Sequence, residues 1–379
     1  MLFRSDTLAA MRIESSPKSV ISSFFASLES GPADAARAVR APSGEALQAV
    51  PRSGFAHFLS SSPPVRHAPH FNGPGVRVRY FGHACVLLQS SRCSILFDPV
   101  VTCDASDCDR RLTLVDLPDR IDYVVLSHCH QDHFCPETLL QLRHKIGTVI
   151  VPPNNRGELA DPSMKLILRH LGFHRIRTLD AFESVELPEG CVVGVPFSGE
   201  HGDLDIHTRQ SAYVTLAGRR FLFLVDSDGI DPGLYKRLAR RFNNVDAVFL
   251  GMECFGAPVS WLYGPLFTRP LNRKNDESRR LSGCLAERAW GVVDSIGCSQ
   301  AFVYAMGQEP WLRYLMGLEY QPDSFQLREC DTFFDRCRAG GIHAERLFGC
   351  AEWVWNGSES RPVAETSIRT PQADHTSCN

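Results

Sequence analysis

The sequence predicts an α/β protein in which two β-sheets carry helices on their outer faces. Strand-like and helix-like patterns alternate between Val76 and Trp355, and they do so in two successive halves, which favours two sheets over one. Side chains of metal-ligand types also follow several of these strands directly. At 379 residues the chain is long enough for one large domain or two modest ones.

The first half begins with three strand patterns that form a meander, followed by strands and helices in alternation. Its expected strands are Val76–Phe81, Cys85–Leu88, Ser94–Pro99, Asp122–Leu126, Gly147–Val151, Ile176–Leu179, Ser184–Leu187 and Cys191–Pro196. Its expected helices are Glu137–Lys145 and Pro162–Leu171.

The second half begins with a predicted hairpin, Ser211–Leu216 and Arg220–Val225, around Ala217-Gly218. Further strands are expected at Ala247–Gly251, Ala301–Ala305 and near Arg346–Trp355, and helices at Pro232–Arg241 and Leu285–Ile296. Residues 261–284 read as a long polar loop, and the segment after the turn at 306–310 has a mixed pattern.

Composition changes near both ends of the chain. Residues 1–74 are rich in Ser, Ala and Pro, which predicts a small helical extension and linker of unknown function. We expect the catalytic domain at 75–355 and a polar, disordered tail at 356–379.

The overall composition excludes several classes of protein. A hydrophobic share of 44%, a charged share of 22% and a net charge of −3 are those of an ordinary globular protein without a basic nucleic-acid footprint. There is no apolar run of membrane-spanning length and no basic segment followed by an apolar one at the N-terminus. The fourteen cysteines form no CxxC pair. These features predict a cytoplasmic protein with reduced thiols and with neither a nucleic acid nor a membrane as partner.

The turn after the strand Asp122–Leu126 holds His128, His130, Asp132 and His133 within six residues. His128 and His130 are two residues apart on an extended backbone, so both side chains can point to one side and bind one ion. Asp132 and His133, in the turn that follows, can bind a second ion beside it. Imidazole and carboxylate donors together suit zinc, iron or manganese better than magnesium or calcium. A polar turn without a metal is the alternative.

Acidic residues follow two later strands at the same expected sheet edge. Asp226 and Asp228 follow the apolar strand Arg220–Val225, whereas Asp231 is better placed to cap the next helix. Glu253 follows Ala247–Gly251 and is a candidate general base or a partner of a metal ligand, although a solvated Glu explains it equally well.

The pattern at 128–133 resembles the HxHxDH signature of the metallo-β-lactamase fold, an αβ/βα four-layer sandwich with a binuclear metal site at one edge. Tyr80–Ala84 and Phe97–Pro99 add to the resemblance. In that fold an Asp bridges both metals, which implies Asp226 here with Asp228 as second choice. Two later histidines complete the two ligand sets. The fold alone does not define the reaction.

The first of these later positions offers two neighbouring candidates, Glu200 and His201. The chain is most similar to the diiron hydroxylase branch of the chloramphenicol-biosynthesis type, in which a glutamate takes this place, so Glu200 is favoured over His201. A further carboxylate favours iron over zinc. The last position is a departure, because no histidine lies between His207 and His343. Glu309, or Gln308 beside it, is the substitute that the strand-and-turn pattern offers, unless Glu309 only caps its turn.

The resemblance therefore implies two transition-metal ions, with iron favoured and zinc or manganese as the alternative. It implies an oxygenase that hydroxylates an amino-acid-like small molecule, free or tethered to a carrier protein, and that needs an electron donor. The alternative is a dizinc or dimanganese hydrolase of lactones, amides or phosphodiesters, with Asp132 or Glu253 moving the proton.

Overall fold

The computed structural model describes residues 68–101, 111–158, 161–199, 206–255, 260, 268–276, 283–312, 316 and 319–356. All of them belong to one compact unit, His67–Asn379. The expected N-terminal extension up to residue 67 and the tail beyond Asn356 lie outside the described residues, as do Glu200 and His201.

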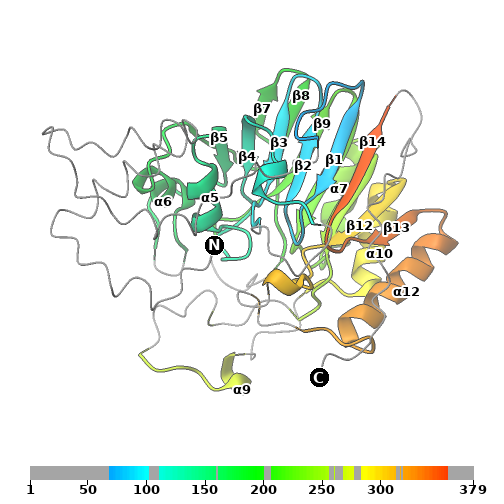
Figure 1. Cartoon of the computed structure of the whole chain (residues 1–379). Helices are drawn as coiled ribbons and strands as arrows, with labels where there is room; N and C mark the ends of the chain where they lie inside the picture. Colours follow the sequence, from blue (N-terminus) through cyan, green and yellow to red (C-terminus); the bar gives the residue numbers. More distant parts are fainter. Residues whose placement is uncertain are drawn as a thin grey trace, which may run out of the picture. The chain divides into compact units, whose positions relative to one another are not determined.

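Two mixed seven-stranded sheets form the centre of this unit (Figure 1). The first sheet has the order β14-β1-β2-β3-β4-β5-β6 and the second β13-β12-β11-β10-β9-β8-β7. The strands of the first sheet are β1 (Val76–Tyr80), β2 (Val86–Gln89), β3 (Ser94–Phe97), β4 (Ile121–Val125), β5 (Ile146–Val151), β6 (Ile176–Thr178) and β14 (Ala351–Trp355). Those of the second are β7 (Ser184–Leu187), β8 (Gly190–Val195), β9 (Ser211–Leu216), β10 (Arg219–Val225), β11 (Ala247–Gly251), β12 (Gln300–Tyr304) and β13 (His343–Arg346).

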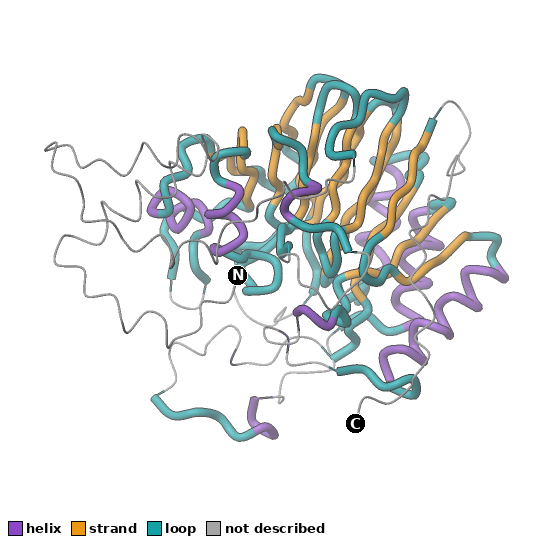
Figure 2. The backbone as a smooth tube through the Cα atoms, in the orientation of Figure 1, coloured by secondary structure: helices purple, strands orange, loops and turns teal. Residues whose placement is uncertain are grey.

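The two sheets pack face to face on aromatic side chains. Phe97 of the first sheet stacks on Phe223 of the second at 3.9 Å between ring centroids, and Phe249 and Phe302 continue the row. Burial of such large rings supplies much of the free energy that holds the sheets together. Figure 2 shows the strands gathered between helices on either side.

Helices cover the outer face of each sheet, as the sequence predicts. Apolar side chains of α5 (Pro136–Leu142) and α6 (Met164–His170) pack on the first sheet. Those of α7 (Pro232–Arg241), α10 (Ala286–Ile296) and α12 (Phe325–Ala339) pack on the second. The expected αβ/βα four-layer sandwich is confirmed.

Two helices were not expected from the sequence. The fifteen-residue α12 lies in the segment with a mixed pattern, and its buried side chains include Cys330, Phe333 and Cys337. Their spacing is that of one helix face, but it becomes visible only if cysteine is counted as apolar. The short α9 (Arg273–Asp276) lies in the expected long loop. Two single-turn 3₁₀ helices, η1 (Leu114–Asp116) and η3 (Pro310–Leu312), complete the described elements.

The sheet topology brings the carboxyl ends of several strands to one edge. β3 and β4 are parallel, and so are β10, β11 and β12, so the residues that follow them emerge on the same side. Non-glycine residues at this edge that have a left-handed backbone include His83 (φ 52°), Asp98 (φ 34°), Val225 (φ 53°) and Ala305 (φ 52°). Such conformations cost energy and cluster at functional sites, which points to this edge.

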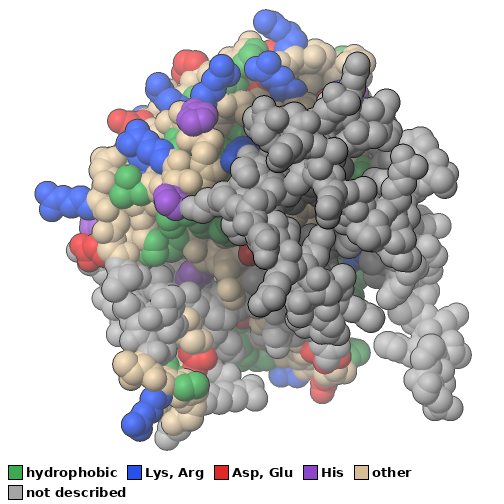
Figure 3. All heavy atoms as spheres, turned by 60° about the vertical axis from the view of Figure 1, so that its left-hand side comes forward, with side chains coloured by type: hydrophobic (Ala, Val, Ile, Leu, Met, Phe, Trp, Pro, Cys, Tyr) green, Lys and Arg blue, Asp and Glu red, His purple; other side chains and the backbone are tan. Residues whose placement is uncertain are grey.

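No helix among the described residues is long and apolar enough to cross a membrane. On the face drawn in Figure 3, the described Lys and Arg side chains are interspersed with Asp and Glu. This distribution agrees with the absence of a basic footprint in the composition.

Candidate metal centre

The turn after β4 places all four predicted ligands in the interior. His128, His130, Asp132 and His133 are at most 5% exposed. The backbone of His128 still forms a β-bridge, to Arg209 beside the second sheet, so its side chain has a fixed direction. Buried polar groups at this density need partners or an ion.

Asp98, directly after β3, orients two of the histidines. Its carboxylate accepts hydrogen bonds from the Ser127 amide (2.8 Å), the Ser127 hydroxyl (2.6 Å) and His133 Nδ1 (2.9 Å). Because the hydroxyl donates to Asp98, it accepts from His128 Nδ1 at 2.9 Å. Both rings are thereby fixed as tautomers whose Nε2 carries a lone pair, which is the form that binds a metal.

These Nε2 atoms converge on Asp226. The Oδ2 atom of Asp226 lies 3.4 Å from His128 Nε2 and 3.1 Å from His133 Nε2, and the three residues form one potential ligand group. His128 Nε2 also lies 3.1 Å from His130 Nδ1. Two nitrogens that share one ion at about 2.1 Å each lie roughly 3.0–3.4 Å apart, so this spacing fits a common metal. The Asp226 oxygen therefore lies within 3.4 Å of ring nitrogens from two different histidines of the turn.

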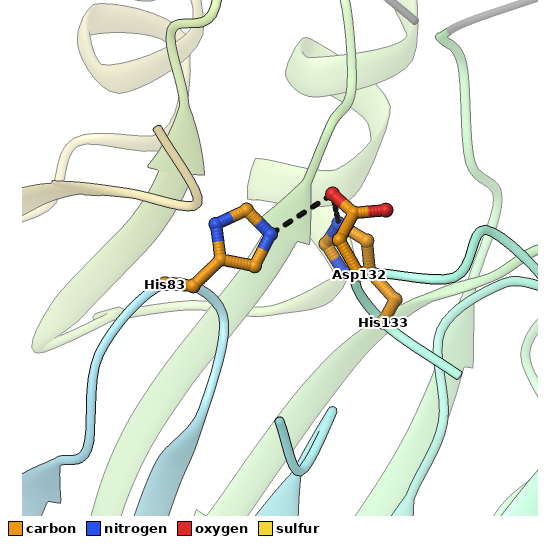
Figure 4. A group of neighbouring side chains, drawn as sticks. All are labelled: His83, Asp132 and His133. Atoms are coloured by element: carbon orange, nitrogen blue, oxygen red, sulfur yellow. Dashed lines mark hydrogen bonds and ion pairs between the residues drawn. The ribbon is translucent and has the colours of Figure 1, made fainter. Parts of the chain in front are cut away.

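A second group combines Asp132 with His133 and His83 (Figure 4). Asp132 Oδ2 lies 3.4 Å from His133 Nε2 and 3.0 Å from His83 Nε2. His83 comes from the hairpin between β1 and β2 and is completely buried. No local sequence pattern places His83 beside Asp132, because the two residues are 49 positions apart.

The donor set fits a cation. Within the described residues, the buried atoms His133 Nε2 and Asp132 Oδ1 have no hydrogen bond of normal geometry. Buried polar atoms that lie close to other potential ligand atoms gain the partner they lack when they bind a metal ion. The mixed nitrogen and carboxylate donors suit zinc, iron or manganese.

The charges in the cluster are strongly coupled. Burial, the largest influence, opposes the charge on His133, yet the Asp226 and Asp132 carboxylates raise its pKa well above the usual value. Burial also opposes the charge on these two carboxylates, but His133 and its neighbours lower the pKa of both. Burial and the charge on His133 lower the pKa of His128. Without an ion, a proton on His133 thus lies between two ionised carboxylates, and a metal ion would displace it.

The end of β10 is shaped to deliver Asp226. The pairing of β10 with β11 shifts register between Phe223 and Val225, and Val225 adopts a left-handed backbone, which is rare for a β-branched residue. Gly251 leaves space for this turn, since a Cβ atom there would lie 2.9 Å from the Val225 carbonyl oxygen and 3.2 Å from Asp226 Oδ1. The turn that carries Asp226 therefore depends both on the irregular end of β10 and on Gly251 in β11.

The structure distinguishes Asp226 from its neighbours. Asp228, the second choice for the bridging role, accepts hydrogen bonds from the Ser198 hydroxyl and the Ile230 amide, both at 3.1 Å, and belongs to neither ligand group. Asp231 caps α7, where its side chain accepts from the Gly233 amide, as expected.

Two other predicted residues follow strands that end at this edge, but they do not join the cluster. Glu309 is buried, and its Oε1 accepts hydrogen bonds from the Tyr80 hydroxyl and from the His83 amide (2.9 Å). Glu253 follows β11 at the same edge and is half-buried. Neither belongs to the two ligand groups that the described residues form, so both assignments remain predictions. His343, an outside candidate, lies exposed at the start of β13, at the opposite edge.

Comparison with known proteins agrees with this geometry. Residues 94–258 match the β-lactamase superfamily domain. The crystal structure of CmlA, a diiron β-hydroxylase from Streptomyces venezuelae, superposes with a TM-score of 0.73 at 35% identity, covering 85% of this chain and 59% of that one. The chain contains a domain of the β-lactamase superfamily. The fold predicted from the HxHxDH pattern is therefore confirmed.

Within this superfamily the chain is similar to one kind of enzyme in particular. It is 38% identical over 297 residues to the 4-amino-L-phenylalanyl-[CmlP-peptidyl-carrier-protein] 3-hydroxylase of Streptomyces venezuelae, covering 77% of this chain and 56% of that protein. A shorter match, 32% over 141 residues, is to a putative Rieske iron–sulfur protein of Mycolicibacterium smegmatis and covers 23% of it. The chain thus spans little more than half the length of the hydroxylase that it resembles.

Proposed function

We propose that this protein is a binuclear metalloenzyme that hydroxylates an amino-acid-like substrate in specialised metabolism, with two irons as cofactor. The observation that carries the proposal is the position of Asp226 Oδ2, within 3.4 Å of both His128 Nε2 and His133 Nε2. The similarity to a carrier-dependent 3-hydroxylase supports iron and supports a substrate tethered to a carrier protein. An electron donor is then a required partner.

In this proposal the ligands divide into two sets that share Asp226. His128, His130 and Glu200 bind one iron, with Glu200 preferred to His201. Asp132 and His133 bind the other, and Glu309 is the predicted substitute for the missing last histidine. The carboxylates bring hard oxygen donors and negative charge, both of which favour iron over zinc.

Two irons in this site would supply the binding and activation of dioxygen for attack on a C–H bond. The chain's own contribution is to hold and shield the site. Asp98 fixes the tautomers of His128 and His133. The layers of buried side chains beneath the turn keep water from the ligand atoms on that side.

The alternative is a dizinc or dimanganese hydrolase, in which Asp132 or Glu253 takes the proton of the attacking water. Asp132 supports this role through its Oδ1 atom, which has no hydrogen-bond partner within the described residues. Hydrolysis is also the activity of many other members of the fold, so a direct test is needed.

Metal analysis combined with turnover separates the two proposals. The oxygenase proposal expects about two irons per chain and dioxygen-dependent hydroxylation of an aminoacyl group on a carrier protein. Zinc or manganese at that ratio, with hydrolysis that needs no dioxygen and is lost in Asp132→Ala, would establish the hydrolase instead.

A second experiment assigns the untested ligand. Glu200→His is expected to shift the metal preference toward zinc and to abolish the oxygen chemistry, while His201→Gln leaves the iron content unchanged. The opposite pattern would assign the role to His201.

The oxidation state of the cysteines bears on the proposed location of the protein in the cell. All eleven cysteines among the described residues are free thiols, which supports the proposed cytoplasmic location in a reducing compartment.

A further inference from the structure

We propose that His83 is a positioning residue that fixes Asp132 for metal binding, and that the segment Ala305–Glu309 holds His83 in place. This inference rests on the metal centre proposed above. It concerns a hairpin and a strand end that lie far from the HxHxDH turn in the sequence. Distance alone would also allow His83 to be a ligand, since it belongs to one of the two potential ligand groups.

All four polar atoms of His83 are engaged. Its amide donates to Glu309 Oε1 (2.9 Å), and its carbonyl accepts from the Ala305 amide (3.0 Å). The Gly307 amide donates to ring atom Nδ1 (3.1 Å), and Nε2 lies 3.0 Å from Asp132 Oδ2. Three of these four bonds come from the chain that follows β12, so this strand end determines both the backbone and the ring of His83.

The bond from Gly307 decides the role of the ring. A backbone N–H can only donate, so Nδ1 must be the atom with the lone pair. In the neutral ring the proton is then on Nε2, which donates to Asp132 and has no lone pair for a metal. The opposite tautomer would direct two N–H groups at each other, at a cost of about 1–3 kcal/mol for the unsatisfied donor. His83 therefore binds the ligand Asp132 and is not itself a ligand.

The hydrogen bond from His83 engages one oxygen of the Asp132 carboxylate and does not engage the other. Oδ2 accepts from His83, while the buried Oδ1 has no hydrogen-bond partner within the described residues. A carboxylate held by a hydrogen bond to Oδ2 cannot rotate freely. Both Oδ1 and the Oδ2 atom, which lies 3.4 Å from His133 Nε2, are therefore directed without further loss of entropy on metal binding.

Glu309 and Tyr80 form the outer part of the same network. Glu309 Oε1 accepts from both the Tyr80 hydroxyl and the His83 amide, and each of these residues is at most 2% exposed. Neighbouring Gly82 has φ 103°, and a Cβ atom there would come within 3.0 Å of Trp311 and 3.4 Å of Glu309. The hairpin is thus packed directly against the Glu309 side chain, whose Oε1 supports His83, while the buried Oε2 has no hydrogen-bond partner within the described residues and stays available for the predicted ligation.

The test is a titration of the metal-free protein with Co²⁺, followed by visible absorption, in the wild type and five variants. His83→Ala removes the donor to Asp132 and is expected to weaken the second ion by about 10- to 100-fold while the first binds normally. His83→Gln replaces the ring with an amide whose N–H reaches a similar position, and we expect it to restore binding to within a few-fold.

Glu309 variants separate support from ligation. Glu309→Gln keeps an oxygen that accepts both hydrogen bonds, so if Glu309 only supports His83, affinity for the second ion should change little in Glu309→Gln and fall in Glu309→Ala. His343→Ala is the matched control, because His343 is exposed at the far edge of the second sheet. Thermal unfolding of each metal-free variant reports whether it folds.

The outcomes are distinguishable from failure of the proposed function. If the wild type binds fewer than two ions, the binuclear site itself is wrong. If it binds two, and His83→Ala binds both as tightly, the positioning role is refuted. Equal losses in His83→Gln and His83→Ala would identify His83 as a ligand, and equal losses in both Glu309 variants would identify Glu309 as one.

Discussion

Replacing Asp98 by Asn should weaken the binding of both metal ions, although residue 98 touches neither of them. In the native protein the Asp98 carboxylate accepts from the Ser127 amide, the Ser127 hydroxyl and His133 Nδ1. An amide at position 98 keeps one acceptor oxygen and gains a donor. If that oxygen keeps the Ser127 amide, the new NH₂ group faces His133 Nδ1 and favours the tautomer with a proton on Nε2.

The size of the effect follows from the bonds that are lost. A hydrogen bond to a charged group contributes about 1.5–3 kcal/mol, and the mutant must either lose the one from His133 or bind metal through the disfavoured tautomer. Since 1.4 kcal/mol is a factor of ten, the second ion should bind about 10- to 100-fold more weakly. The first ion should weaken less, because Asp98 acts on His128 only through the Ser127 hydroxyl.

Competition with a chelator measures both dissociation constants, and Asp116→Asn provides the control. Asp116 is equally buried and accepts from the Thr113 amide and hydroxyl, so its amide variant should lower the free energy of unfolding without changing metal affinity. Unchanged affinities in folded Asp98→Asn would refute the assignment of tautomers in the site.

Three further predictions concern the metal site and the fold around it. Gly251→Ala should weaken metal binding, because the added methyl group displaces Val225 and Asp226. Its control, Gly291→Ala, lies inside α10 with open space around it and should be neutral or stabilise the fold by up to about 1 kcal/mol. Equal metal content in both variants would contradict the prediction. The pKa of His133 is higher in the metal-free folded protein than in the unfolded chain. Protonation of His133 therefore stabilises the metal-free fold fully at pH values below the unfolded-state pKa, and this stabilisation is lost as the pH rises through the folded-state pKa. Thermal melts from pH 6 to 9 should therefore show the metal-free protein losing more stability than the metal-bound protein, and parallel curves would argue against it. Phe333→Ala should lower the free energy of unfolding by about 3–5 kcal/mol in urea titrations, because the ring is completely buried under α12, and metal affinity of the folded variant should not change.

Local patterns made most of the fold predictable. The strands and helices that flank the site carry clear periodicity, and several bounds, such as Ser211–Leu216 and Pro232–Arg241, agree with the structure residue for residue. The helix α12 was missed because two of its core positions are cysteines and a third buried position is Gln326. Its helical face is therefore only weakly apolar on common scales.

The site was predictable where its residues are close in sequence or follow parallel strands. The turn at 128–133 carries four residues of ligand types together, and Asp226 could be proposed because it follows an apolar strand where the resembled fold carries its bridging Asp. The contact of His83 with Asp132 was not predictable, since it depends on how the β1–β2 hairpin lies against the end of β12. No periodicity within either segment encodes that packing.

The number and identity of the metal ions test the central claim most directly. The purified protein should contain about two iron ions per chain, and Asp226→Asn, which removes the charge shared by both ligand sets, should reduce this to one or none. Two ions retained at full affinity in Asp226→Asn, or less than one transition-metal ion per chain in the wild type after reconstitution, would contradict the account of a shared binuclear site.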